Sequence, residues 1–312
     1  MPGSVLVAGE SLVDVVIGPD GHTIEVTPGG APLNVAVGLA RLDVPTRLLT
    51  AFGPDPHGDL VGRHLQESGV RLQPGSDAAG RTAVARASLD AQHRATYEFE
   101  LSWDPPPATL PSDLQGLHVG SLGTVVEPGA ARIGALAAQA RAAGVVVSYD
   151  PNVRPAALAA VPDPWHDVRG HAAGATVVKL SDEDAQHLQP GRALDDLLDE
   201  LLGGEHTLLA AVTRGEHGLR MATRDHRIDV PAPPVDVVDT VGAGDACMAG
   251  LLAGLHAREQ LETQALGSMT ESDLAAVGAA AVEVAALTCS RRGANPPWRR
   301  ELRGGPWRPQ PR

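Results

Sequence analysis

Short apolar segments alternate along this chain with longer segments in which apolar residues recur every three or four positions. Several short segments are apolar throughout, which is typical of strands buried in a parallel sheet, whereas the longer spacing is that of amphipathic helices. We predict strands over Val5–Ala8, Arg47–Ala51, Leu117–Gly120, Val145–Tyr149, Thr176–Leu180 and Thr207–Thr213. We predict helices over Leu33–Leu42, Asp59–Ser68, Pro128–Ala143, Leu194–Leu202, Asp245–His256 and Ser272–Thr288, with Ser272 as the N-cap of the last.

This alternation predicts an α/β fold with a mostly parallel central sheet and helices on both faces. Two segments, about 13–27 and 82–103, depart from it and are typical of hairpin strands, the second with a turn at 90–93. We expect these two segments to form a small, separate β-sheet. Residues 298–312 are rich in Arg, Pro and Gly, and we expect a flexible tail there.

Composition narrows the class of protein. The 312 residues carry a formal net charge of −13, which argues against a nucleic-acid partner, although backbone amides are able to bind a phosphate without basic side chains. Two cysteines are too few for a disulfide scaffold. The N-terminus lacks a basic signal-peptide region, and Asp245 and Glu283 interrupt the most apolar stretches. We therefore expect a cytoplasmic protein with no membrane span.

The most informative motif is Gly242-Ala243-Gly244-Asp245, which precedes an Ala- and Leu-rich helix. Small residues before a helix allow several N–H groups to point at one anion, where the helix dipole also favours negative charge. A carboxylate beside that anion is well placed to accept a proton from an attacking hydroxyl. Alternatively, the motif is only a tight turn and Asp245 complements the dipole. The third glycine of a dinucleotide-binding motif is missing, which disfavours a nicotinamide oxidoreductase.

A second cluster lies near the N-terminus, where Gly29 and Gly30 precede a helix that carries Asn34 in its first turn. Glycines allow close approach to the backbone, and an amide side chain both donates and accepts hydrogen bonds. Together with Asp14 on the preceding segment, these groups suit a polyhydroxylated ligand.

The stretches Gly29-Gly-Ala-Pro-Leu-Asn-Val-Ala and Asp239-Thr-Val-Gly-Ala-Gly-Asp resemble the paired signatures of the PfkB (ribokinase-like) carbohydrate kinases, and most resemble the fructokinase branch. The resemblance implies a single kinase domain over 1–312, with the two off-pattern segments forming a β-lid over the sugar. It implies ATP-dependent transfer of the γ-phosphoryl group to a sugar hydroxyl, with fructose as the expected sugar. It also implies Mg²⁺ and, in some members, K⁺.

The same resemblance assigns roles to individual residues. Asp245 is the expected general base, and the amides of Gly242, Ala243 and Gly244 form the expected anion hole. Expected sugar contacts are Asp14, Gly29, Gly30, Asn34, Asn152 and Arg154. Expected nucleotide contacts are Ser181, Thr213, Gly215 and Gly218, and expected metal-site residues are Glu183, Asp184 and, at a monovalent-cation loop, Asp239. In the family's N-x-x-E element, Ser181 replaces the asparagine and Asp184 the glutamate.

Other functions remain open at this stage. A 2-keto-3-deoxygluconate-type kinase and a ribose or nucleoside kinase of the same family share the base and the anion hole. A non-catalytic sugar-binding regulator is a further alternative. An open-edged lid offers a route to a homodimer, because its strands are able to pair with a second lid.

Overall fold

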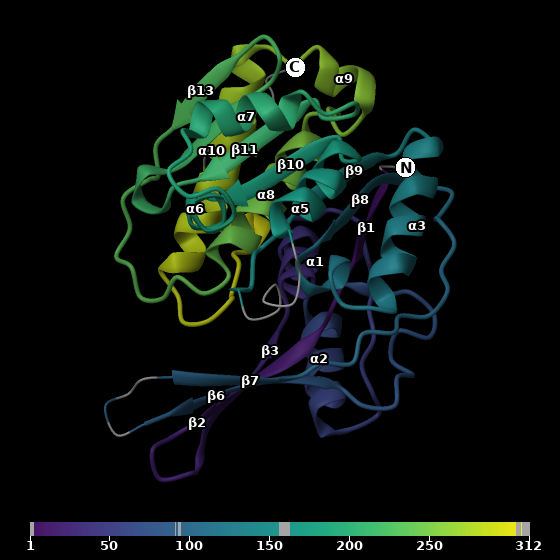
Figure 1. Cartoon of the computed structure of the whole chain (residues 1–312), viewed down its shortest axis with the longest axis vertical. Helices are drawn as coiled ribbons and strands as arrows, with labels where there is room; N and C mark the ends of the chain where they lie inside the picture. Colours follow the sequence, from purple (N-terminus) through teal and green to yellow (C-terminus); the bar gives the residue numbers. More distant parts are fainter. Residues whose placement is uncertain (1–2, 91, 93–94, 156–162, 304–306, 308–312) are drawn as a thin grey trace.

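The computed structural model describes residues 3–90, 92, 95–155, 163–303 and 307 (Figure 1). Within them, one large sheet has the strand order β13-β12-β11-β10-β9-β8-β1-β4-β5. All neighbours from β11 to β5 run parallel, and β12 and β13 add an antiparallel edge. The strands are β1 (Ser4–Ala8), β4 (Thr46–Leu49), β5 (Arg71–Leu72), β8 (Leu114–Gly120), β9 (Val146–Asp150), β10 (Val177–Ser181), β11 (Leu209–Thr213), β12 (Leu219–Ala222) and β13 (Arg227–Val230).

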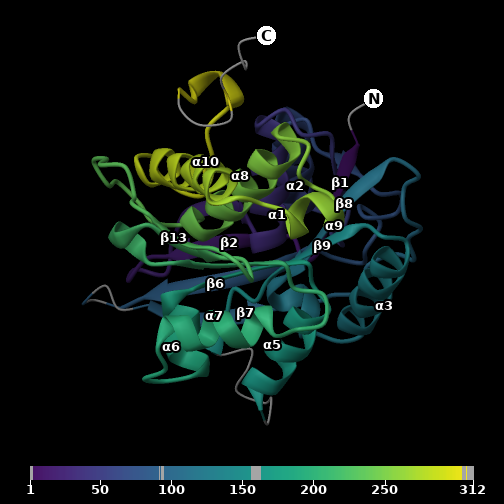
Figure 2. The ribbon, with the colours of Figure 1, turned by 90° about the horizontal axis from the view of Figure 1, so that it is seen from above.

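Helices cover both faces of this sheet (Figure 2). Because successive side chains of a strand point to opposite faces, Val5 and Val7 of β1 join one apolar core and Leu6 joins the other. The first core is covered by α1 (Ala31–Arg41), α2 (Pro56–Glu67), α8 (Ala243–Ala257), α9 (Thr263–Gly267) and α10 (Glu271–Cys289). The second is covered by α3 (Gly129–Ala142), α5 (Pro164–Ala173), α6 (Asp182–Leu188) and α7 (Leu194–Leu202). Single turns of 3₁₀-helix are η1 (Ser121–Thr124), η2 (Gly215–His217) and η3 (Arg299–Glu301).

A second, four-stranded sheet stands apart from the main body at the bottom of Figure 1. It consists of β3 (Thr23–Gly29), β2 (Leu12–Ile17), β6 (Ala83–Leu89) and β7 (Ala95–Glu100), in that order. Two hairpins, distant in sequence, meet where β2 and β6 pair in parallel. The expected α/β fold with a small separate sheet is thus confirmed. The predicted turn at 90–93 includes residues 91 and 93, which lie outside the described residues.

Two of the connections to the small sheet meet at Gly123 of η1. Its N–H donates to Glu10 Oε2 at 2.7 Å, just before β2. Its carbonyl accepts the indole N–H of Trp103 at 3.0 Å, just after β7. Glu10 is buried, and this burial raises its pKa to about 7 although hydrogen bonds to Ser121 and Gly123 oppose the shift. The first and last strands of the small sheet are therefore tied to the same turn of the main body.

Helix α10 begins two residues earlier than the expected N-cap, Ser272, would allow. Thr270 is the N-cap: its hydroxyl accepts the N–H of Asp273, and the Asp273 carboxylate accepts the N–H of Thr270. The prediction of Ser272 was therefore wrong. By length and apolar composition α10 could span a membrane, but half of its most apolar window is buried within the molecule, where α10 packs on α8. This is also the pattern of a core helix.

The described residues of the C-terminal segment, 298–303 and 307, contact the main body, whereas the sequence predicted a flexible tail over 298–312. Leu302 and Trp307 are buried in the core shared with α8 and α10. The Arg303 N–H donates to Glu283 of α10 at 2.9 Å, and the guanidinium of Arg41 lies 5.3 Å from the ring centre of Trp298. Residues 298–303 and 307 are thus packed rather than free, whereas 304–306 and 308–312 lie outside the described residues.

Candidate active site

The first turn of α8 exposes backbone donors. Gly242 is its N-cap in the left-handed region at φ 74°, and a Cβ there would lie 2.5 Å from that of Ala294. In the described part of the chain, the N–H groups of Gly242 and Gly244 have no acceptor. The N–H of Ala243 instead donates to Thr240 O at 3.2 Å. Two of the three predicted anion-hole donors are therefore available, and the third is already bonded within the turn.

Asp245 lies in the same turn with its carboxylate held from two sides. Asn34 Nδ2 donates to Oδ2 at 2.8 Å, and Asn152 Nδ2 donates to Oδ1 at 3.1 Å. The residue is buried, and burial raises its pKa, while the Asn34 hydrogen bond and the positive charges of Lys179 and Arg154 oppose the rise. The result is an oriented carboxylate with increased basicity, as a general base requires.

Asn34 also presents an acceptor that the protein does not use. Its Oδ1 is buried and has no hydrogen-bond partner among the described residues. A buried carbonyl oxygen without a donor is costly, and a ligand hydroxyl would satisfy it. This atom lies on the same side chain that holds Asp245, so a hydroxyl bonded to it would lie close to the base.

The predicted sugar contacts of the N-terminal motif surround this amide. Gly30 is the N-cap of α1 at φ 105°, and a Cβ there would lie 2.7 Å from Glu10 O. A Cβ on Gly29 would lie 2.1 Å from Asp14 Oδ2, so the Asp14 carboxylate lies directly against this backbone. Desolvation by the surrounding protein raises the pKa of Asp14, and the charge of Arg154 opposes this. The motif thus brings a carboxylate, an amide and bare backbone together.

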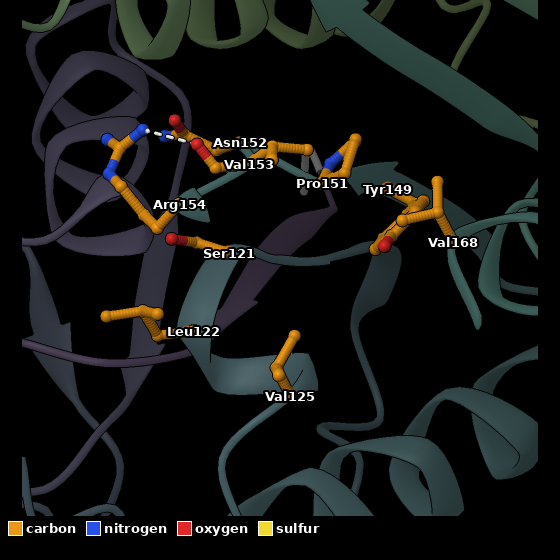
Figure 3. A pocket seen from close by; sticks show the side chains of 9 residues that line it. All are labelled: Ser121, Leu122, Val125, Tyr149, Pro151, Asn152, Val153, Arg154 and Val168. Carbon is orange, nitrogen blue, oxygen red and sulfur yellow. Dashed lines mark hydrogen bonds between the residues drawn. The ribbon is translucent and has the colours of Figure 1, made fainter. Parts of the chain in front are cut away.

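Asn152 and Arg154 follow β9 at the carboxyl edge of the sheet. Figure 3 shows Arg154 extending past Ser121 of η1 toward Asn152, with its guanidinium donating to Val153 O at 3.2 Å. Asn152 adopts φ 39°, which directs its side chain to Asp245. Arg154 is exposed, yet its charge acts on Asp14, Glu10 and Asp245. This places a cation beside the predicted base.

A cleft of about 760 Å³ opens on the other side of the α8 turn. All four predicted nucleotide contacts line it: Ser181, Thr213, Gly215 and Gly218. Ala243 and Gly244 also line it, so the anion hole faces this cleft. One wall is apolar and was not predicted: Pro233, Pro234, Val235, Val237, Val282, Ala285 and Ala286. The run of Pro and Val residues between β13 and the glycine turn was the sequence signal for that wall. An apolar wall of this kind suits the aromatic ring of a nucleotide base.

The three predicted metal-site residues have different environments. Glu183 lines the cleft. Asp184 is buried, and its oxygens accept the N–H of Ser181, the N-cap of α6, at 3.0 Å and the N–H of Val153 at 2.9 Å, so it completes the capping box of α6 and ties it to the segment after β9. The Asp239 carboxylate likewise accepts two backbone N–H groups, from Val241 and Gly293. No cluster of three or more His, Cys, Asp or Glu side chains able to hold a metal occurs in the described ranges.

Sequence reasoning gave Lys179 no role, although it is the only lysine in the chain. It is 3% exposed in β10, and its Nζ donates to Asp150 Oδ2 at 2.7 Å. The signal was present in the sequence, because a lysine within the otherwise apolar run Val177–Leu180 must be buried with a partner.

Comparison with known proteins agrees with this arrangement. Residues 3–300 match the model of the pfkB family of carbohydrate kinases. The chain belongs to this family. It is therefore a carbohydrate kinase, a phosphotransferase that acts on a sugar hydroxyl, and its fold is ribokinase-like.

Relatives within the family include fructokinases. The chain is 35% identical over 265 residues to the fructokinase of Klebsiella pneumoniae, covering 82% of this chain and 86% of that one. A fructokinase from Xylella fastidiosa with bound ATP superposes with a TM-score of 0.81 at 26% identity, covering 94% of each chain. A double mutant of the Vibrio cholerae fructokinase with bound fructose, ADP and a potassium ion gives a TM-score of 0.78 at 26% identity, again covering 94% of each.

Proposed function

We propose that the protein is an ATP-dependent fructokinase in which Asp245 is the general base. The observation that carries this proposal is the position of the Asp245 carboxylate. Asn34 and Asn152, both predicted sugar contacts, each hold one of its oxygens, and it lies in the same helical turn as the free N–H groups of Gly242 and Gly244. A base and an anion hole within one helical turn suit phosphoryl transfer to a hydroxyl.

The sugar would bind against the N-terminal motif. Asn34 Oδ1 would accept a hydrogen bond from one sugar hydroxyl, and the Asp14 carboxylate would accept another. Glycine at positions 29 and 30 keeps the Asp14 carboxylate and Glu10 O close to this backbone, since a Cβ at either position would lie within 3 Å of one of these atoms. Arg154, beside Asn152, is able to donate to sugar or phosphate oxygens.

Asp245 would accept the proton of the attacking hydroxyl as its oxygen forms a bond to the γ-phosphorus. The bond from that phosphorus to the bridging oxygen of ADP breaks, and ADP leaves. The N–H groups of Gly242 and Gly244, with the positive end of α8, would stabilise the charge on the transferring oxygens. The base of the nucleotide would lie on the apolar wall of the cleft, and the phosphates would lie toward Gly244.

The residues of the cleft fit a magnesium ion bound mainly through phosphate oxygens. Glu183 supplies a carboxylate at the cleft, and Mg²⁺ commonly takes one or two carboxylates together with substrate phosphates. Bound there, Mg²⁺ would neutralise charge on the phosphates. Asp184 supports α6 instead, because both of its oxygens already accept backbone N–H groups. A K⁺ ion is proposed for the loop that Asp239 shapes, since a fructokinase relative binds a potassium ion.

The small sheet would act as a lid on the bound sugar and exclude water. The enzyme would work in the cytoplasm.

The small sheet also has an open edge. Strand β3 is an edge strand whose Ile24 and Val26 side chains are 58% and 38% exposed. Such an edge suits pairing with the lid of a second copy, so we propose a homodimer. Light scattering of the purified protein tests this: a monomer mass across micromolar concentrations would contradict it.

A coupled assay of ADP release over fructose, ribose, 2-keto-3-deoxygluconate and adenosine tests the proposed activity. We expect fructose to give a kcat/KM well above the other three, with little ADP released when no sugar is present. Preference for another acceptor would reassign the substrate within the family. Sugar binding without ADP release from any of them would instead indicate a non-catalytic regulator.

A further inference from the structure

We infer that Lys179 is a positioning residue for Asp245. From the buried side of the α8 turn it fixes the Gly244 carbonyl and, through Asp150, the Asn152 side chain that holds the Asp245 carboxylate. This inference rests on the proposed role of Asp245 as the base. Lys179 does not itself line the cleft and is not among the predicted sugar contacts, so any effect it has on transfer must pass through its bonded neighbours, Asp150 and Gly244.

The first of two routes from Lys179 to Asp245 runs through the backbone. Lys179 Nζ donates to the carbonyl oxygen of Gly244 at 3.2 Å. This carbonyl belongs to the peptide that joins Gly244 to Asp245, so the bond fixes that peptide from below. The N–H of Gly244, which has no acceptor among the described residues, is part of the same residue. A cation on the buried side of this residue therefore sets the orientation of both the donor and the base.

The second route runs through side chains. Lys179 Nζ also donates to Asp150 Oδ2 at 2.7 Å, and Asp150 Oδ1 accepts the backbone N–H of Asn152 at 3.3 Å. Asn152 then donates from Nδ2 to Asp245 Oδ1. Because Asn152 has a positive φ of 39°, its backbone conformation needs such support. Both routes begin at one ammonium group and end at Asp245.

The ammonium is well suited to this position because it is charged and almost inaccessible. Lys179 and Asp150 are each 3% exposed. Burial disfavours the charged lysine, but the ion pair with Asp150 outweighs burial and raises the pKa of Lys179. Three donors on one tetrahedral nitrogen are able to serve the Asp150 carboxylate and the Gly244 carbonyl at once. A neutral aliphatic side chain of equal length would serve neither.

A double variant separates positioning from simple structural support. Lys179→Met alone would leave Asp150 buried without its counter-ion, and such variants often lose stability. In Lys179→Met/Asp150→Asn both charges are removed, and the new asparagine keeps an oxygen for the Asn152 N–H. We expect this protein to fold and to show kcat for fructose phosphorylation reduced by about 10- to 100-fold, the size of effect that small misplacements of reacting groups produce. We expect KM for fructose and ATP to change less than about threefold.

The matched control is Arg258→Met/Asp273→Asn, which removes an ion pair at the far end of α8. Thirteen residues of helix separate Arg258 from Asp245, or about 20 Å at 1.5 Å per residue. We expect its kcat to equal that of the parent. Lys179→Arg, which keeps the charge but moves the donors, is the second variant and is expected to lower kcat without raising either KM.

The outcomes are distinct. A folded double variant with kcat within threefold of the parent, or a raised KM with unchanged kcat, overturns the inference. If the double variant does not fold, Lys179→Arg decides by the same criteria. Failure of the parent enzyme to phosphorylate any sugar would instead refute the proposed function, independently of Lys179.

Discussion

The side-chain amide of Asn34 lies 2.8 Å from the carboxylate of Asp245, although 211 positions separate the two residues. One residue belongs to the N-terminal motif and the other to the C-terminal motif, so this bond joins the proposed sugar site to the proposed phosphoryl-transfer site. A substitution at either end should therefore affect both binding and chemistry.

Asp245→Asn should reduce kcat by about 10²–10⁴-fold, the usual contribution of a general base. An asparagine keeps the size of the side chain and is able to accept from Asn34, so fructose binding should persist. Coupled ADP release gives kcat, and isothermal titration gives sugar affinity. Near-parental turnover in this variant would remove Asp245 from the role of base.

Asn34→Leu should move the acidic limb of the kcat/KM profile to higher pH. Burial already raises the pKa of Asp245, and the Asn34 hydrogen bond opposes that rise. Without this bond the pKa of Asp245 rises further, so a larger fraction is protonated, and inactive as a base, at a given acidic pH. The profile from pH 5 to 9 checks this. A limb that stays in place, or moves to lower pH, would show that Asn34 does not support the ionised base.

Glu183→Gln and Asp184→Asn should affect different properties: the first the Mg²⁺ requirement of the enzyme, the second the stability of the fold. The first should raise the Mg²⁺ concentration needed for half-maximal activity, with little change in thermal stability, because Glu183 lines the cleft. The second should lower stability by about 1–3 kcal/mol, because an amide cannot accept both backbone N–H groups that Asp184 now binds. Magnesium titrations and urea unfolding of both variants test this. The reverse pattern would make Asp184 the metal ligand.

Gly30→Ala should destabilise the protein by at least about 1–2 kcal/mol, the cost of a left-handed-type backbone for a residue with a Cβ. The new Cβ would also lie 2.7 Å from Glu10 O, which forces the sugar motif to shift. Gly134→Ala in α3 is the control: it has open space around it and should stabilise the helix by about 0.5–1 kcal/mol. Equal effects of the two substitutions on urea unfolding would contradict this account.

Asp273→Asn should lower stability at neutral pH more than at acidic pH. Burial opposes ionisation of Asp273, but hydrogen bonds from Thr270 and Arg258 outweigh it and lower the pKa well below its usual value. The stabilisation is therefore fully present above the unfolded pKa of about 3.9 and is lost as the pH falls toward the folded pKa. Urea unfolding of both proteins between pH 3 and 7 checks this. A difference that stays constant with pH would contradict it.

Asn34 and Asp245 were each accessible from sequence as site residues, because each lies in the first turn of a helix that follows a glycine-rich turn, but the hydrogen bond between them was not predicted. Such turns are local, and in a parallel sheet they gather at the carboxyl ends of the strands. The small sheet was also predictable, since the period-two pattern of its strands is a local property.

Other features depend on contacts that no local pattern encodes. The strands β12 and β13 have only four residues each, too few for a clear period. The burial of Trp307 and the engagement of Asp184 by the backbone of Val153 arise only when distant segments meet. The cap of α10 is a different case, because Thr270 and Asp273 form a local capping box that the sequence contained and that the choice of Ser272 overlooked.

The single lysine of this chain also allows unfolding of the main sheet to be measured by proteolysis. A protease that cleaves only after lysine has one possible site, in a central strand of the main sheet, with 3% of the residue accessible. Fraying of the termini or movement of the small sheet leaves that bond protected. Cleavage should therefore occur only when the main sheet itself opens, and its rate should fall when ATP or sugar stabilises the folded state.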